Sequence, residues 1–258
     1  MEEKIIRSVT GIGNGAHIFA PKEWIGEEVA LTRISRKNPK EEIIKLLYPY
    51  LDRIISVFLF GSYARNEQQS GSDMDVFVIA STKFSVKSKG MDIIVIPEKK
   101  IDDAKRINPV LFYSMLQEAK QIINPSYLEI LKQEKINPCC FRDFIKETEN
   151  SLFSSREIMN LDKKLKNKWA SESVVYSALL RLRGIFIINL LLNKKAYSKK
   201  IFKEWVAKNS DADYDGAYAI YQAVRENKKS DKRISIEQAE SLLSLLSKET
   251  EILSKKIK

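Results

Sequence analysis

The sequence predicts an α+β fold with three parts: an N-terminal β segment, a small mixed β-sheet domain with flanking helices, and a C-terminal all-α helical bundle. Three observations predict it. Residues 11–15 hold three glycines, which a tight reversal between two short strands needs. Short apolar runs lie between residues 54 and 96, separated by polar loops, as strands do. From about Ser151 onward the pattern is helix after helix, with no clear strand.

The first elements follow from local signals. Residues 4–9, 16–20 and 28–34 alternate apolar and polar side chains, which predicts short antiparallel strands. The pair Asn38-Pro39 predicts a helix start, and spaced apolar side chains give the helix over 39–52 one buried side.

The middle of the chain alternates strands and helices. Apolar runs predict three strands, over 54–60, 75–80 and 92–96. Further helices are expected over 109–121 and from Asn124-Pro125 onward, with a linker around residues 137–140. The expected domains are therefore 1–37, 38–136 and 145–258.

Composition limits the class of protein. The 258 residues are 44% hydrophobic and 30% charged, which is globular and excludes a disordered or collagen-like chain. The only cysteines, Cys139 and Cys140, are adjacent, which excludes a disulfide framework and suits a reducing compartment. The one histidine, His17, excludes any metal site built on a histidine pair.

Charge and hydropathy indicate the class of partner and the compartment of the protein. Residues 1–150 hold 22 basic and 21 acidic residues, whereas residues 151–258 hold 22 and 13. This excess favours a phosphate-rich partner, although a solvated helical surface is the alternative. The N-terminus has no apolar signal core, and the apolar stretch over 174–192 contains Arg181 and Arg183. We therefore expect a buried helix there, no membrane partner and a cytoplasmic protein.

One stretch carries chemistry. The strand ending at Phe60 runs into Gly61-Ser62, where a strand-to-helix turn aims backbone N–H groups at one point and favours a phosphate. After a gap of ten residues come Asp73 and Asp75, whose i, i+2 spacing places both carboxylates on one face of a strand. The following strand brings Asp92 to the same role.

Three converging carboxylates need a cation. At about 4 Å, each pair of like charges costs on the order of 4 kcal/mol at an effective dielectric constant near 20. A divalent ion removes this penalty, and oxygen ligands suit Mg²⁺ or Mn²⁺. The alternative assigns Asp73 to a turn, Asp75 to a strand edge and Asp92 to the surface.

Gly-Ser, the ten-residue gap, Asp-x-Asp and a third Asp on a following strand resemble the DNA polymerase β nucleotidyltransferase superfamily, most of all its minimal nucleotidyltransferases. The resemblance covers roughly residues 38–125. It implies that Asp73, Asp75 and Asp92 are catalytic and hold the metal ions, and that Asp92 helps to orient or deprotonate the attacking hydroxyl.

The same resemblance implies a nucleoside triphosphate, such as ATP, bound by Gly61 and Ser62. Arg65 is a candidate for a further phosphate contact, and the alternative is a solvated charge on a helix. Ser72 is also a candidate phosphate contact, and the alternative is a serine in a simple turn.

The helical part resembles the substrate domain of kanamycin-type nucleotidyltransferases and the bundle of HEPN domains. HEPN ribonucleases need a histidine that residues 38–258 lack, so that activity is excluded. Arg181 and Arg183 cannot share one helix face, so at most one points into a cleft. Three aromatic side chains are candidates for base stacking, with core packing as the alternative: Tyr176, Tyr197 and Trp205.

The N-terminal hairpin resembles AbrB-type modules, which are DNA-binding dimers. The resemblance implies a homodimer formed through this segment, but its six basic and five acidic residues over 1–37 are a poor match to DNA. His17 is expected to pack in the hairpin rather than to catalyse.

Together these observations predict an enzyme that moves a nucleoside monophosphate from a nucleoside triphosphate to an acceptor hydroxyl. The acceptor is an RNA end such as that of tRNA, a protein side chain or a small molecule. The alternative is a non-enzymatic, dimeric, antitoxin-like DNA-binding regulator built on the same fold. Base, acceptor and oligomeric state stay open.

Overall fold

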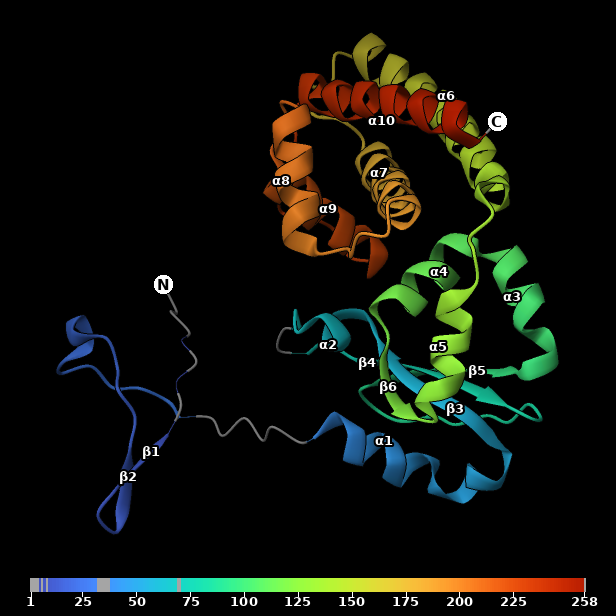
Figure 1. The fold of residues 1–258 in the computed structure, drawn as a ribbon. Helices are drawn as coiled ribbons and strands as arrows, with labels where there is room; N and C mark the ends of the chain where they lie inside the picture. The colour runs from blue at the N-terminus through green and yellow to red at the C-terminus, as the bar shows by residue number, and fades with distance from the viewer. Residues whose placement is uncertain (1–4, 6, 8, 32–37, 69–70, 258) are drawn as a thin grey trace. The chain divides into compact units, whose positions relative to one another are not determined.

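The computed structural model describes residues 5, 7, 9–31, 38–68 and 71–257. The chain divides into two compact units, 1–38 and 39–258. In the first, strands β1 (Thr10–Ile12) and β2 (Gly15–His17) pair antiparallel around the glycine-rich turn, and a short 3₁₀ helix, η1 (Lys22–Trp24), follows. A hairpin therefore forms at the predicted place, but its strands are short and include Gly11, Ile12 and Gly15 of the predicted turn (Figure 1).

The second unit begins with helix α1 (Pro39–Leu47), the 3₁₀ helix η2 (Tyr48–Arg53) and strand β3 (Ile54–Phe60). Strands β4 (Met74–Ala80), β5 (Met91–Pro97) and β6 (Lys120–Ile123) complete a sheet in the order β5-β4-β3-β6. Only β4 and β5 run parallel, and β3 pairs antiparallel with both neighbours. The sheet is mixed, as the sequence predicts.

Helices cover both faces of this sheet (Figure 1). Alternate strand residues such as Phe58 and Phe77 pack against helices α3 (Ile101–Ile107), α4 (Pro109–Glu118) and α5 (Pro125–Gln133). The residues between them face α1 on the other side, as period-2 alternation requires. The short 3₁₀ helix η3 (Glu98–Lys100) precedes α3.

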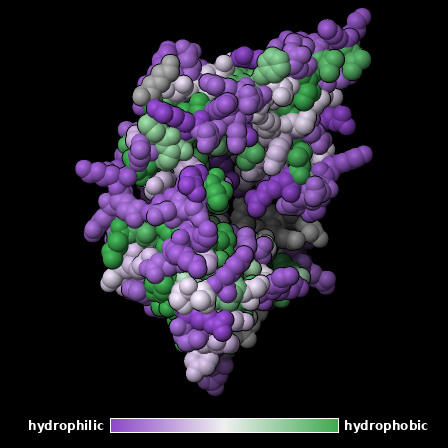
Figure 2. Space-filling view, turned by 90° about the vertical axis from the view of Figure 1, so that its right-hand side faces the viewer, coloured by the Kyte–Doolittle hydropathy of each residue, from purple (hydrophilic) through white to green (hydrophobic). Residues whose placement is uncertain are grey.

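The remaining chain forms a helical bundle. After η4 (Pro138–Phe141) come α6 (Arg142–Lys164), α7 (Glu172–Leu192), α8 (Lys199–Asn209), α9 (Tyr214–Arg225) and α10 (Ile236–Ile257). Helix α7 is long and apolar enough to cross a membrane, but it packs against α6, α9 and α10 and forms the centre of the bundle core. On the face in Figure 2 hydrophilic side chains predominate and hydrophobic ones are scattered.

The α+β fold class is confirmed, and three element predictions need correction. Residues 28–31 form no strand, because no neighbouring strand pairs with them in the described residues. The helix expected over 109–121 ends at Glu118, and the next residues pair with β3 as β6. The helix expected over 39–52 changes to 3₁₀ geometry at Tyr48, one residue before Pro49.

The start of the helical region differs from the prediction, and two predicted strands lie partly outside the described residues. Helix α6 starts at Arg142, before the predicted all-helical region at Ser151. Of the strand predicted over 4–9, residues 5, 7 and 9 are not in a strand, and residues 4, 6 and 8 lie outside the described residues, as do 32–34 of the third strand.

Candidate functional site

The loop after β3 packs directly on Asp75. Gly61 begins the short helix α2 (Gly61–Arg65) with a φ of +71°, a conformation that favours glycine. A Cβ atom at this position would lie 1.9 Å from Oδ2 of Asp75. Any side chain there would therefore have to displace the carboxylate, which explains glycine at the end of this strand.

Asp75 and Asp92 lie side by side. The two strands that carry them, β4 and β5, run parallel, and Asp75 is the register partner of Asp92. Partial burial, and then the charges of Asp92 and Glu118, raise the pKa of Asp75 to about 6, while Arg65 and Arg225 act in the opposite direction. The site therefore holds acids close enough to repel one another.

Asp73 occupies a different position. It is exposed and lies one residue before β4 begins. Within the described part of the chain, no group of three His, Cys, Asp or Glu side chains is arranged to hold a metal ion. The carboxylates of Asp75 and Asp92 are the oxygen ligands that Mg²⁺ and Mn²⁺ take, and their mutual repulsion is what a cation relieves. The three-carboxylate site stays a prediction, in which Asp73 would have to turn toward the pair.

Arg65 is held by two carboxylates. Its Nε donates to Oε2 of Glu67 at 2.8 Å, and its Nη1 donates to Oε2 of Glu118. The other oxygen of Glu118 accepts the N–H of Gly61 at 2.8 Å. The Arg65 side chain is only 15% exposed, so the alternative of a freely solvated charge on a helix is wrong. Ser62, in α2, and Ser72, before β4, are both half-buried.

Two residues of the site were missed by sequence reasoning. Glu118 ends α4 and touches both Gly61 and Arg65. Its only sequence signal was its place in the segment that follows the third acid. Arg225 ends α9 in the bundle, yet its charge acts on Asp75, 150 positions earlier in the chain. No local pattern indicates such a contact.

The bundle and the sheet domain meet beside α2. The backbone N–H of Lys199, the first residue of α8, donates to Oε1 of Glu67 at 3.0 Å. Nε2 of Gln117 donates to the carbonyl of Lys195 at 2.6 Å. One contact joins the residues after α2 to the start of α8, and the other joins the end of α4 to the loop before α8. The bundle therefore forms a wall next to the site.

The structure separates the two neighbouring arginines of α7. Arg181 pairs with Glu147 at 3.1 Å and packs over Phe144, whereas Arg183 is largely buried with its guanidinium over the Tyr197 ring. The expectation that at most one of them points toward the site is consistent with this arrangement.

The aromatic candidates for base stacking pack against other aromatic rings. Tyr176 stacks on Tyr221 with ring centres 5.3 Å apart, and Trp205 lies 5.0 Å from Phe186. Tyr197 lies between Arg65 and Arg183, with each guanidinium carbon 5.3 Å from the ring centre. Core packing therefore accounts for Tyr176 and Trp205, while Tyr197 joins the bundle to the site.

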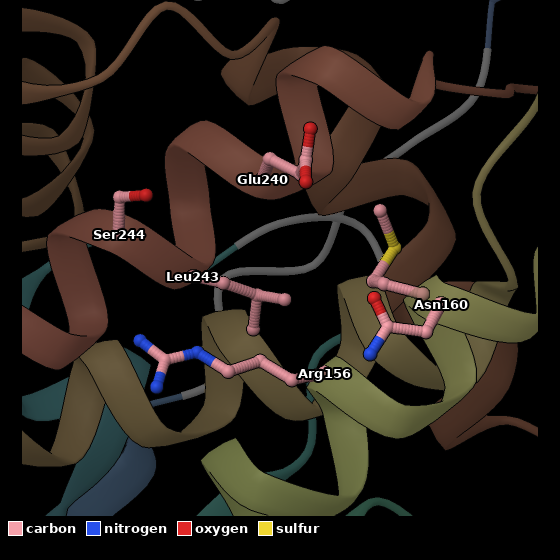
Figure 3. A pocket seen from close by; sticks show the side chains of 6 residues that line it. Arg156, Asn160, Glu240, Leu243 and Ser244 are labelled. Atoms are coloured by element: carbon pink, nitrogen blue, oxygen red, sulfur yellow. The ribbon is translucent and has the colours of Figure 1, made fainter. Parts of the chain in front are cut away.

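His17 lies in strand β2 of the first unit. His17 accepts or donates a 3.1 Å hydrogen bond with Thr10 across the hairpin and packs edge-on against Phe19. A groove between α6 and α10 contains no predicted site residue (Figure 3). It is lined by Arg156, Met159, Asn160, Glu240, Leu243 and Ser244.

Comparisons with known proteins agree with the sequence motif. Residues 41–158 match the family model described as polymerase beta, nucleotidyltransferase. A search of curated protein sequences gives no match.

Three solved structures are similar at low sequence identity. A toxin-antitoxin crystal structure with AMP-PNP is 19% identical and covers 37% of this chain and 82% of its own, with a TM-score of 0.28. Spectinomycin adenyltransferase AAD(9) from Enterococcus faecialis, with ATP and spectinomycin, is 16% identical over 82% of this chain and 97% of its own, with a TM-score of 0.43. A nucleotidyltransferase-like protein from Exiguobacterium sibiricum 255-15 is 12% identical over 85% and 78%, with a TM-score of 0.41.

Proposed function

We propose, from the match of residues 41–158 to the polymerase beta nucleotidyltransferase family model, that the chain transfers a nucleoside monophosphate from a nucleoside triphosphate to an acceptor hydroxyl. The acceptor oxygen forms a bond to the α-phosphorus, the bond from that phosphorus to the bridging oxygen breaks, and pyrophosphate leaves. The observation that carries this proposal is the contact of Gly61 with Asp75, which is itself in register with Asp92.

Asp75 and Asp92, joined by Asp73, would hold Mg²⁺ or Mn²⁺. Such an ion would offset the negative charge of the carboxylates and of the phosphates that they face. With a pKa of about 6, the Asp75 carboxyl is mostly ionised at pH 7, as an ion ligand must be. Asp92, at the exposed end of the pair, is the residue assigned to orient the attacking hydroxyl and accept its proton.

Gly61, Ser62 and Arg65 are assigned to the triphosphate, with Ser72 as a further contact. The main support is the position of this loop directly above Asp75. The N–H of Gly61 is already donated to Glu118, so this residue contributes its lack of a side chain, which leaves room for a phosphate. The Ser62 hydroxyl can donate a hydrogen bond. We take ATP as the first nucleotide to test.

For the acceptor we propose an RNA end, with the protein acting in the cytoplasm. The bundle carries most of the excess positive charge, and the charge of its Arg225 acts to lower the pKa of Asp75. A cationic wall attracts a polyanion and repels a cationic small molecule. We retain a homodimer formed through the hairpin as part of the proposal.

The test is transfer of label. The full chain is incubated with each α-labelled nucleoside triphosphate, Mg²⁺ or Mn²⁺, and total RNA or lysate. We expect labelled RNA from the unmodified protein and none from the double variant Asp73→Asn/Asp75→Asn. The matched control is Asp102→Asn/Asp103→Asn, which removes two charges from α3, one at an exposed and one at a half-exposed position, and should retain activity.

The same assay separates the alternatives. Label on a protein band or on a small molecule would move the acceptor away from RNA, and activity that survives excess EDTA would contradict the metal role. A salt-dependent shift of duplex DNA that hairpin variants abolish, with no label transfer, would favour the DNA-binding regulator.

A further inference from the structure

Two loops of the helical bundle carry a dense group of basic side chains. Residues 163–169, at the end of α6 and in the loop before α7, hold four lysines and no acid. Residues 228–233, in the loop between α9 and α10, hold four basic residues and one acid. All eight basic residues are exposed, and we call them the basic surface: Lys163, Lys164, Lys166, Lys168, Lys228, Lys229, Lys232 and Arg233.

The two loops lie side by side, although they are far apart in the sequence. Trp169 forms an antiparallel bridge with Ser235, and the N–H of Ala170 donates to the carbonyl of Ile234 at 3.1 Å. Each basic run ends at this bridge, so the two runs converge there. One partner can therefore contact both.

Polar contacts within the bundle fix both loops. The carboxylate of Asp162, which is only 5% exposed, accepts the N–H of Ser171 at 2.9 Å and the side-chain donors of Ser171 and Asn167 at 3.0 Å. In the other loop, Ser235 and Gln238 exchange hydrogen bonds of 3.3 Å at the start of α10. None of these bonds uses a basic side chain. The backbone is therefore ordered before a partner binds, which lowers the entropic cost of binding.

Most of the basic surface has no counter-ion within the described part of the chain. Lys163 pairs with Glu240, and Lys228 pairs with Glu226 at 2.6 Å. The ion pairs among the described residues include none of the other six basic side chains. Unpaired like charges repel one another, and a polyanion relieves that repulsion.

An indole lies where the two basic runs meet. The Trp169 side chain is 38% exposed, and Nζ of Lys168 lies 4.9 Å from the centre of its ring. Among residues 163–169 and 228–235, all of which the structure describes, Leu165 is the only other exposed large apolar side chain. Proteins bind single-stranded nucleic acids with cations for the backbone and aromatic rings for the bases. A bilayer would require a broader apolar face than these two side chains provide.

We propose that the basic surface binds the sugar-phosphate backbone of a single-stranded RNA segment and that Trp169 stacks on one of its bases. Each cation that neutralises a phosphate releases condensed counter-ions, so the affinity comes mainly from charge and requires little base sequence. The choice of RNA among polyanions rests on the proposed function, whose acceptor is an RNA end. The surface holds the body of that acceptor, a role separate from that of the carboxylates and the triphosphate loop.

Fluorescence anisotropy of a labelled oligoadenylate measures binding to the full chain in EDTA, without triphosphate, over a range of salt concentrations. We expect the triple variant Lys164→Gln/Lys166→Gln/Lys168→Gln to bind tenfold or more weakly at low salt. The slope of log affinity against log salt concentration should become shallower by about 2, because each lost phosphate contact removes about 0.7.

The matched control is Lys135→Gln/Lys146→Gln/Lys248→Gln, which removes the same charge from exposed positions outside the basic surface. It should bind the oligoadenylate within twofold of the unmodified protein. An equal loss of affinity in the control would mean that only net charge matters, and would overturn the surface.

Variants of Trp169 test the stacking contact. Trp169→Ala should weaken binding fivefold or more and leave the salt slope unchanged, because stacking releases no counter-ions. Trp169→Phe keeps an aromatic ring and should restore most of the affinity. Trp169→Leu replaces the alanine variant in this comparison if that variant does not fold. Unchanged affinity in the variant without a ring would overturn the role of the indole.

The remaining outcomes decide the partner. The surface is overturned if the unmodified protein does not bind oligoadenylate at low salt, or if the triple lysine variant binds it with the same affinity and slope. Binding to phosphatidylserine vesicles that the triple variant loses, with RNA affinity unchanged, would assign the surface to a membrane and contradict the RNA proposal.

These outcomes are separate from failure of the proposed function, because binding is measured without turnover. Label transfer by the unmodified protein, with RNA binding that the triple variant retains, contradicts the surface alone. RNA binding that the triple variant loses, in a protein that transfers no label, contradicts the transferase alone.

Discussion

Gly61 and Asp75 depend on each other at the scale of single residues. The loop can lie over the carboxylate only because residue 61 has no side chain. We predict that Gly61→Ala lowers the free energy of unfolding by about 3 kcal/mol, from the combined backbone strain and collision. Denaturant titration measures the change.

Gly90→Ala is the matched control, because its φ is also positive, at +79°, but a Cβ there meets nothing within 4 Å. It should cost about 1 kcal/mol, the cost of backbone strain alone. Equal losses for the two variants would mean that the contact with Asp75 adds nothing.

The raised pKa of Asp75 makes stability depend on pH. In the metal-free protein its pKa is about 6, against 3.8 in the unfolded chain, so the unfolded state holds fewer protons between these values. Stability therefore falls as pH rises from 4 to 6.5. We predict that Asp75→Asn removes this decline and raises the free energy of unfolding at pH 7 by about 1 kcal/mol, after allowance for solvent screening.

Denaturant titrations of both proteins at pH 4, 5, 6 and 7 in EDTA test this prediction. Asp102→Asn, an exposed acid on α3, controls for the general effect of removing a negative charge. An unchanged decline in Asp75→Asn would show that another group causes it.

Glu118 acts at the scale of elements, since it connects α4 to α2. It accepts the N–H of Gly61 and pairs with Arg65 while only 14% exposed. We predict that Glu118→Ala lowers the free energy of unfolding by about 3 kcal/mol, because it leaves Arg65 with one carboxylate fewer and the Gly61 N–H without a partner.

Glu118→Gln separates the two effects. The amide oxygen can still accept from Gly61 but carries no charge, so a loss of about 1 kcal/mol is expected. Thermal unfolding of the two variants beside the exposed control Glu129→Gln on α5 measures the difference. A loss in Glu118→Gln as large as in Glu118→Ala would assign the whole effect to charge.

The elements also explain what the sequence could predict. The strands β3, β4 and β5 are apolar runs with period-2 packing, so local pattern identified them. The strand register agrees with the expectation that the following strand brings Asp92 to Asp75, whereas the i, i+2 spacing did not place Asp73 on β4. Strand β6 was missed because Lys120–Ile123 is half polar and becomes a strand only by pairing with β3. Residues 28–31 have the alternation but no partner strand in the described residues. Strand pairing depends on residues far apart in the sequence, so a local pattern of apolar and polar residues does not predict it.

The same reasoning applies to the site. Gly61 and the acids belong to one continuous motif, whereas Glu118 and Arg225 reach it from helices far along the chain. Their contribution depends on how α4 and α9 pack, which no spacing reveals.

At the scale of the whole molecule, the division into units 1–38 and 39–258 predicts that the second unit is stable without the first. A chain that starts at residue 39 should keep its unfolding temperature within about 2 °C of the full chain, since the β3–β6 sheet and the bundle lie entirely in the second unit. Differential scanning calorimetry measures it. If the hairpin holds a homodimer, light scattering should report a dimer for the full chain and a monomer for the shortened chain.

A larger fall in unfolding temperature would mean that residues 1–38 support the second unit. A shortened chain that is still dimeric would assign the dimer contact to residues 39–258.

The aromatic cluster beside Arg183 has a practical consequence for spectroscopy. Trp205 touches Phe186 and Phe202, both neighbours of Tyr197, whereas the other two indoles are Trp24 in the hairpin unit and Trp169 before α7. Replacing Trp24 and Trp169 with Phe would leave one fluorophore two rings away from the guanidinium. The emission of that single indole would then report in real time when a ligand disturbs the packing, without any attached dye.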